Sequence, residues 1–385
     1  MCDPGLAVKK SRYTVYGDRI DALIDRHLDV INRGVLSIVG KDELEAVILC
    51  GGYGRGEGGV FIDSQGSEAL YNDYDMFVII KPMRQPRKAF YQNELKKLGH
   101  SLGKEFGIEV DFGPLKTIDQ MRSAPYTLFN YELRYGHIVT YGRQDILSVM
   151  PEWEGDSIPV MEAAKLLLNR GVGLFLSRQK LANEPDSDAA NEFVTRNIYK
   201  AVMAIGDAAL MCERTYHFSY LRRLELMEDI RQSSIVKSLD IYDDYLSSME
   251  YKLRPARNIF NRQQLSAMLD KNIEKLLRMF FIVSGKVFKL PDGAGYNMFA
   301  QGFLSDSNPV CIARNMLLNF KTFKLHGFDP VWFMKYPRMR LFYCLAYILD
   351  REPKPSKAQV CRVLGICKDQ GNIEQRFMDL WERYG

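Results

Sequence analysis

The first 150 residues alternate between helix-like and strand-like patterns of apolar and polar positions. Residues 18–34 and 88–106 carry apolar side chains at helical spacing. Three short apolar runs, at 46–50, 74–80 and 108–112, are bounded by glycine, proline or acidic residues and predict strands. Both element types within one stretch favour an α/β or α+β domain.

After about residue 150 the pattern becomes almost entirely helical. The stretch 285–308 is rich in Gly, Pro, Asp, Ser and Asn and predicts a long loop, either a substrate-facing segment or a simple connector. The 385 residues are enough for two domains, so we expect an α+β domain with a mixed sheet at 1–150 and an all-helical domain at 151–385. Helices are expected at 160–182, 190–213, 217–232, 262–284, 309–320, 330–350 and 371–382.

A glycine-rich turn follows the first expected strand. Gly51 and Gly52 open the sequence GGYGRGE, which ends at Glu57. Backbone N–H groups in such a turn can approach a phosphate closely because glycine has no Cβ. An isolated glycine pair more often marks only a tight connection, and the spacing here differs from that of a P-loop.

Acidic residues start the next expected strand and recur on the one after it. Asp73 and Asp75 point to the same face of a strand, and Asp111 lies in an alternating acidic and apolar pattern at 108–112. Like charges this close need a cation, and Mg²⁺ prefers oxygen ligands. Three carboxylates beside a phosphate-binding turn suit two-metal phosphoryl or nucleotidyl transfer, although a solvated strand end is the alternative for the aspartate pair alone.

The order of these elements resembles the nucleotidyltransferases of the DNA polymerase beta superfamily over residues 44–142. The sequence motif GGYGRGE, followed by an aspartate pair, is similar to that of the catalytic core of the bacterial uridylyltransferases that modify the nitrogen-signalling regulator protein. The resemblance implies a magnesium-dependent enzyme, with two ions, that transfers a nucleotide from an NTP to a hydroxyl and releases pyrophosphate. It implies that Gly51 and Gly52 hold the triphosphate. Asp73, Asp75 and Asp111 would bind the metal, and Asp111 would also help to deprotonate the acceptor.

The chain departs from this pattern in two ways. Residues 53–72 separate the glycine pair from the aspartates, a longer spacing than usual, and read as an inserted loop over the site. The helical half shows no phosphohydrolase motif and is more similar to the helical domain of small-molecule nucleotidyltransferases such as those that act on aminoglycosides. That domain forms a wall of the cleft, so Lys200 is a candidate phosphate contact, with an ordinary exposed helix position as the alternative. Arg55 in the glycine-rich turn is a similar candidate.

Charge and composition limit the kinds of partner and the cellular location that we expect for the protein. The net charge is only +4, and no basic stretch is interleaved with aromatic residues, so we expect a small-molecule or protein acceptor rather than RNA. The longest apolar run is Leu341–Leu349, too short for a membrane span, and seven scattered cysteines without a CxxC pair fit a reducing cytoplasm. Two other hypotheses remain: a catalytically silent nucleotide-binding regulatory or antitoxin-like protein of the same fold, and a helical adaptor with an incidental acidic pair.

Overall fold

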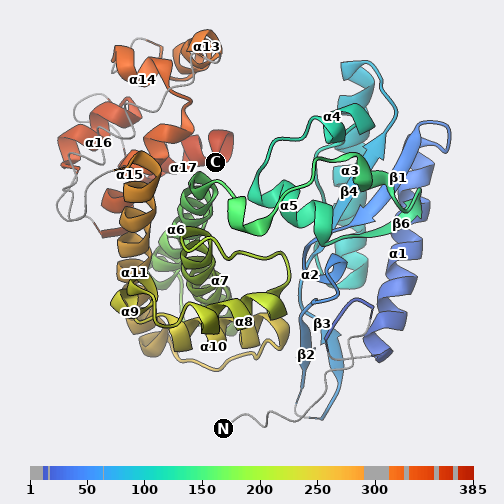
Figure 1. The fold of residues 1–385 in the computed structure, drawn as a ribbon, viewed down its shortest axis with the longest axis horizontal. Helices are drawn as coiled ribbons and strands as arrows, with labels where there is room; N and C mark the ends of the chain where they lie inside the picture. The colour runs from blue at the N-terminus through green and yellow to red at the C-terminus, as the bar shows by residue number, and fades with distance from the viewer. Residues whose placement is uncertain are drawn as a thin grey trace. The chain divides into compact units, whose positions relative to one another are not determined.

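The computed structural model describes residues 12–15, 18–63, 65–289, 312–324, 329–350, 355–366 and 372–385 (Figure 1). The chain divides into two compact units. Unit 1 comprises Met1–Pro159, Glu213–Ile230 and Leu246–Arg257, and unit 2 comprises Val160–Cys212, Arg231–Tyr245 and Asn258–Gly385. The expected arrangement placed all of 151–385 in the helical domain, whereas residues 151–159, 213–230 and 246–257 belong to unit 1. The last two of these segments carry much of the site described below.

Unit 1 is built on a four-stranded sheet of order β5-β4-β1-β6. Strand β1 (Leu44–Leu49) is antiparallel to β4 (Tyr74–Ile80) and β6 (Ile138–Gly142), and β4 is parallel to β5 (Val110–Phe112). This is the mixed sheet of the predicted α+β class. The sequence predicted β1, β4 and β5 but not β6.

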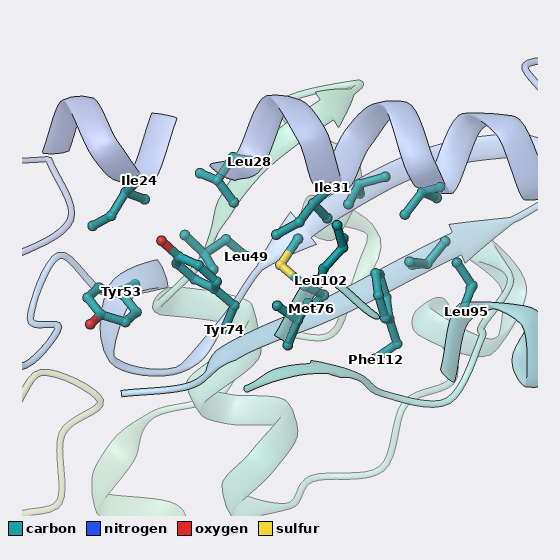
Figure 2. Close-up of a cluster of buried hydrophobic side chains, with 14 of the residues drawn as sticks. Ile24, Leu28, Ile31, Leu49, Tyr53, Tyr74, Met76, Leu95, Leu102 and Phe112 are labelled. Atoms are coloured by element: carbon teal, nitrogen blue, oxygen red, sulfur yellow. The ribbon is translucent and has the colours of Figure 1, made fainter. Parts of the chain in front are cut away.

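One face of the sheet is covered by α1 (Asp18–Val39) and α3 (Gln85–Phe106), as Figure 1 shows. Figure 2 shows Ile24, Leu28 and Ile31 of α1 pointing toward Leu49, Tyr74 and Met76 of the two central strands. The spacing of these α1 residues places them on one side of the helix. They are almost completely buried, so the apolar face of α1 forms one side of this core.

The opposite face of the sheet has a second core. It is covered by the short helices α4 (Ile118–Arg122) and α5 (Leu128–Tyr135) and by the 3-10 helix Ile146–Val149. Residues at alternate positions of the same strands, such as Ile48 and Phe77, point into it. Because both faces are buried, the central strands read as continuous apolar runs rather than as alternating ones.

The segment between the glycine pair and the aspartates is a compact structure. It begins with the short helix α2 (Gly51–Gly54) and continues into a two-stranded antiparallel hairpin, β2 (Val60–Ile62) and β3 (Glu68–Leu70). The sequence predicted an inserted loop here, because strands of three residues are too short to leave a clear periodic signal.

The helical part follows the predicted pattern closely. The long helices α6 (Val160–Asn183), α7 (Asp188–Cys212) and α11 (Arg262–Phe288) pack together in unit 2 (Figure 1). Helix α11 extends to Phe288 because its apolar repeat continues past the expected end, and residues 290–308 of the expected long loop lie outside the described residues. The remaining helices are α8 (Tyr220–Asp229), α9 (Ser234–Leu239), α10 (Tyr242–Leu253), α13 (Ile312–Phe323), α14 (Pro330–Met334), α15 (Arg338–Asp350), α16 (Lys357–Leu364) and α17 (Ile373–Tyr384).

Two details of the helical part differ from the expectation. The helix expected at 330–350 is interrupted between α14 and α15, where Pro337 lies. Helices α9, α10 and α16 were not predicted, since each carries only about two to three turns of apolar repeat. Among the helices that the structure describes, none is long and apolar enough to cross a membrane.

Candidate active site

The glycine-rich turn leaves β1 and presses directly on the aspartate strand. Gly51 has a positive φ of 64°, a conformation that favours glycine. A Cβ at this position would lie 2.0 Å from Oδ2 of Asp75, and the N–H of Cys50 donates to the Asp75 carbonyl over 2.8 Å. Gly51 is partly exposed, whereas Gly52 is buried. Gly51 is therefore required both for the backbone conformation and for the close approach to Asp75.

The three predicted carboxylates lie at the start of β4 and on its neighbour β5. Asp75 of β4 pairs in register with Asp111 of the parallel strand β5. Asp73 directly precedes β4, and its charge raises the pKa of Asp75, whereas Tyr74 points to the side opposite Asp75, where its hydroxyl lies 3.1 Å from Nδ1 of His27. Asp73 and Asp75 are partly exposed, and Asp111 is exposed. The structure thus pairs Asp75 with Asp111 on adjacent strands, and the joint role of these two residues with Asp73 stays a prediction.

The electrostatic surroundings of Asp75 disfavour its negative charge. Burial and the neighbouring charge of Asp73 raise the pKa of Asp75 to about 6, and Asp111 adds to the effect. Lys252 and Arg55 oppose this shift without cancelling it. Within this acidic edge, which comprises Asp73, Asp75 and Asp111, the charged form of Asp75 is therefore disfavoured, mainly by burial and by the charge of Asp73.

A preformed metal cage is not part of this edge. Within the portion of the chain that the structure describes, no group of three or more His, Cys, Asp or Glu side chains is arranged to hold a metal ion. The donor chemistry nevertheless suits Mg²⁺, which commonly binds one or two carboxylates and takes its other ligands from substrate phosphates and water. The pair Asp73 and Asp75 supplies two such carboxylates. A cation bound beside Asp75 would offset the repulsion from Asp73 and Asp111.

Arg55 is engaged away from the acidic edge. Its buried guanidinium forms an ion pair with Glu132 of α5, with 3.2 Å between Nη1 and Oε2, and donates to the hydroxyl of Tyr220. It also lies 4.4 Å above the Tyr220 ring. Glu132 accepts from Arg223 and, over 2.6 Å, from the Tyr216 hydroxyl.

These partners decide the charge state of Glu132. Burial alone would raise the pKa of Glu132, but Arg55 and Arg223 outweigh it, and the pKa falls to about 2. The guanidinium of Arg55 thus belongs to a compensated buried cluster. Its predicted role as a direct phosphate contact stays a prediction, and its observed contacts fasten the turn to α5 and α8.

The other two side chains of the GGYGRGE turn also hold neighbouring segments. Glu57 is fully buried and accepts from Ser219 Oγ over 2.5 Å and from the Tyr220 N–H over 2.7 Å, at the start of α8. The hydroxyl of Tyr53 donates to the Gly59 carbonyl over 3.0 Å and accepts from the N–H of Asn72 over 3.3 Å. The motif therefore organises the site, a role that its glycine spacing alone does not reveal.

Lys252 is a site residue that the sequence reasoning missed. It lies in α10, within the segment that belongs to unit 1, and its charge lowers the pKa of Asp75. Its Nζ lies 5.7 Å from the centre of the Tyr220 ring. No motif surrounds this lysine, so only the packing of unit 1 reveals it. Lys200, the lysine that the sequence suggested instead, is a half-buried residue of α7 in unit 2, and its phosphate role stays a prediction.

Comparisons with known proteins do not identify the family. No family model matches the chain. No curated protein matches it either. Among solved structures, the chain is similar to the spectinomycin adenyltransferase AAD(9) from Enterococcus faecialis, whose crystal structure contains ATP and spectinomycin. The two are 12% identical, with a TM-score of 0.37, over 66% of this chain and 99% of that one. At this level of similarity, function has to be argued from the residues themselves.

Proposed function

We propose that this protein is a magnesium-dependent nucleotidyltransferase that moves a nucleoside monophosphate from an NTP to an acceptor hydroxyl. The observation that carries the proposal is the acidic edge: Asp75 lies in register with Asp111, follows Asp73 by two residues and touches the glycine-rich turn. Burial and the charge of Asp73 disfavour the charged form of Asp75, which a bound cation would favour. Such an edge is suited to receive a cation together with an anionic substrate.

The residues of unit 1 divide the chemistry between them. The backbone N–H of Gly51, at the start of α2, and the ammonium group of Lys252 supply positive partners for the polyphosphate. Asp73 and Asp75 would hold Mg²⁺, with two ions as the expected number. When bound, the metal would neutralise charge on the phosphate oxygens.

Asp111 is the proposed base, because it is the most exposed of the three carboxylates and so the most accessible to an acceptor. It takes the proton of the acceptor hydroxyl as the hydroxyl oxygen bonds to the α-phosphorus. The bond between the α-phosphorus and the bridging oxygen breaks, and pyrophosphate leaves with that electron pair.

The acceptor belongs to the proposal only as a class. The net charge of +4 is small, so the protein has little general attraction for nucleic acid, and a small molecule or a protein is the acceptor we propose. The likeness of GGYGRGE to the regulator-modifying uridylyltransferases remains a sequence resemblance and does not select between these two acceptors.

A transfer assay tests the proposed function. The intact chain is incubated with Mg²⁺, a cell extract and each of the four NTPs labelled at the α-phosphate, and both label transfer and pyrophosphate are measured. We expect both products with at least one NTP and a loss of about a hundredfold or more in Asp111→Asn. The control Asp119→Asn, which removes an exposed ion pair with Arg122 on α4, should retain transfer. Tight NTP binding without either product would instead identify a silent nucleotide-binding protein.

A further inference from the structure

The hairpin β2–β3 and the residues directly next to it contact the segment 246–257 at several points. The hydroxyls of Tyr71 and Tyr251 lie 2.6 Å apart in a hydrogen bond, and their rings are perpendicular. The guanidinium of Arg257 lies 4.6 Å above the ring of Phe61 in β2. These contacts lie on either side of Lys252 in the sequence, so the backbone of this lysine is fastened both before and after it.

A third contact lies at Lys252 itself. A Cβ at Gly59 would lie 2.6 Å from the Lys252 carbonyl oxygen and 2.6 Å from Oδ1 of Asn72. The N–H of Gly59 donates to that same Asn72 oxygen over 2.7 Å. Asn72 is buried and directly precedes Asp73. The absence of a side chain at Gly59 therefore lets the Lys252 backbone pack beside the residue that leads into the acidic strand.

The side chain of Lys252 lies near Tyr220, a residue that is itself held by hydrogen bonds. Its ammonium lies near the ring of Tyr220. The Tyr220 N–H donates a hydrogen bond to Glu57, and Arg55 donates one to the Tyr220 hydroxyl. Glu57 and Arg55 both belong to the glycine-rich turn. The backbone of Lys252 is thus held by the hairpin, and its side chain lies against a residue that the turn holds.

We propose that the hairpin β2–β3 positions Lys252 for the polyphosphate of the nucleotide, with Tyr71 and Tyr251 as positioning residues. The inference rests on the proposed function, since it names the residue that meets the phosphates and what places it there. It also explains the long spacing between Gly52 and Asp73. The extra residues form a support that brings a lysine from a distant part of the sequence to the acidic edge.

A double-mutant cycle tests this role without relying on activity. Binding of magnesium tripolyphosphate, which carries no base, is measured by calorimetry for the intact chain and for Lys252→Met, Tyr251→Phe and the double variant. We expect Lys252→Met to weaken binding by about tenfold and Tyr251→Phe by about threefold. In the Lys252→Met background, Tyr251→Phe should have no further effect. Tyr71→Phe removes the same hydrogen bond from the other side and should match Tyr251→Phe.

Tyr135→Phe is the control, because its hydroxyl accepts from the Trp153 N–H over 3.0 Å outside the hairpin. It should leave tripolyphosphate affinity unchanged. Thermal unfolding is recorded for each variant, so that a folding defect is distinguished from a binding defect. The proposal is overturned if Lys252→Met binds normally, or if Tyr251→Phe weakens binding as much without the lysine as with it. Either result would leave the proposed function standing if Asp111→Asn still loses transfer, whereas retained transfer in Asp111→Asn would count against the function itself.

Discussion

Two acidic groups in unit 1 have opposite electrostatic environments. Glu132 is enclosed by Arg55 and Arg223 and accepts the Tyr216 hydroxyl, and its pKa falls to about 2. Burial and the charges of Asp73 and Asp111 disfavour the charged form of Asp75, and its pKa rises to about 6. Both carboxylates are partly withdrawn from water, and they differ in how far nearby positive charges offset the cost of burial.

This difference separates a structural cluster from a candidate binding site. A buried carboxylate whose partners are all present stabilises the assembled structure. A carboxylate whose charge is left uncompensated costs stability, and a cation that binds beside it recovers that cost. Arg55 takes part in both environments, because it pairs with Glu132 and also lowers the pKa of Asp75. The glycine-rich turn therefore links the structural cluster to the site.

Removing the uncompensated charge should have the largest effect on function. Asp75→Asn is expected to lower nucleotide transfer by about a thousandfold, equivalent to about 4 kcal/mol, because the proposed magnesium site would lose one of its two ligands. The unfolding free energy should stay the same or increase, since repulsion from Asp73 and Asp111 is relieved. Transfer rates and urea unfolding measured on the same preparation check both statements. Substantial transfer by the folded variant would contradict the assignment of Asp75.

Removing the compensated charge should instead affect stability most. Glu132→Gln is expected to lower the free energy of unfolding by about 3 kcal/mol, because Arg55 and Arg223 lose their shared carboxylate in a buried setting. The matched control Glu94→Gln, which breaks an exposed pair with Lys97, should cost less than about 1 kcal/mol. Urea denaturation compares the two variants, and similar losses for both would refute the distinction between the two environments.

The two environments also predict opposite responses to pH. Glu132 contributes stability above its ordinary pKa of 4.5 that is lost as pH falls toward 2. Asp75 acts in reverse, since its raised pKa makes the native state lose stability as pH rises from about 4 to 6. Asp75→Asn should therefore be more stable than the parent above pH 6 by about 1–2 kcal/mol, with the two nearly equal at pH 4. Denaturation curves at several pH values measure this difference, and a constant offset would rule out the explanation.

The smallest effect is expected at the residue between the two aspartates. Tyr74 points to the opposite face of the sheet and lies 3.1 Å from His27. Tyr74→Phe should lower the unfolding free energy by about 1 kcal/mol through the lost hydrogen bond, and transfer should change by less than about twofold. The same assays check it. A large loss of transfer would show that the acidic face of β4 is not the functional one.

The sequence predicted the parts of the molecule that depend on local pattern. Long helices such as α6 and α7 and the buried strand β4 follow from the periodicity of their apolar residues. The strands that carry Asp75 and Asp111 were predicted in the same way, and the structure pairs these two residues, whereas the role of Asp73 stays a prediction.

Features that depend on long-range packing were not predictable in this way. The contact between Glu57 and the start of α8 joins residues more than 160 positions apart. The return of 246–257 to unit 1, which brings Lys252 to the site, likewise leaves no periodic signal. The sequence likewise could not show that Arg55 pairs with Glu132, and the predicted contact of Arg55 with phosphate stays a prediction.

The most direct test of the central claim measures ATP binding to the intact chain by calorimetry, with and without Mg²⁺, in the parent and in Asp75→Asn. If the acidic edge is a cation site completed by the nucleotide, Mg²⁺ should tighten ATP binding by about tenfold or more in the parent, and this enhancement should disappear in Asp75→Asn. An ATP affinity that does not depend on Mg²⁺, or an enhancement of equal size in the two proteins, would contradict the account.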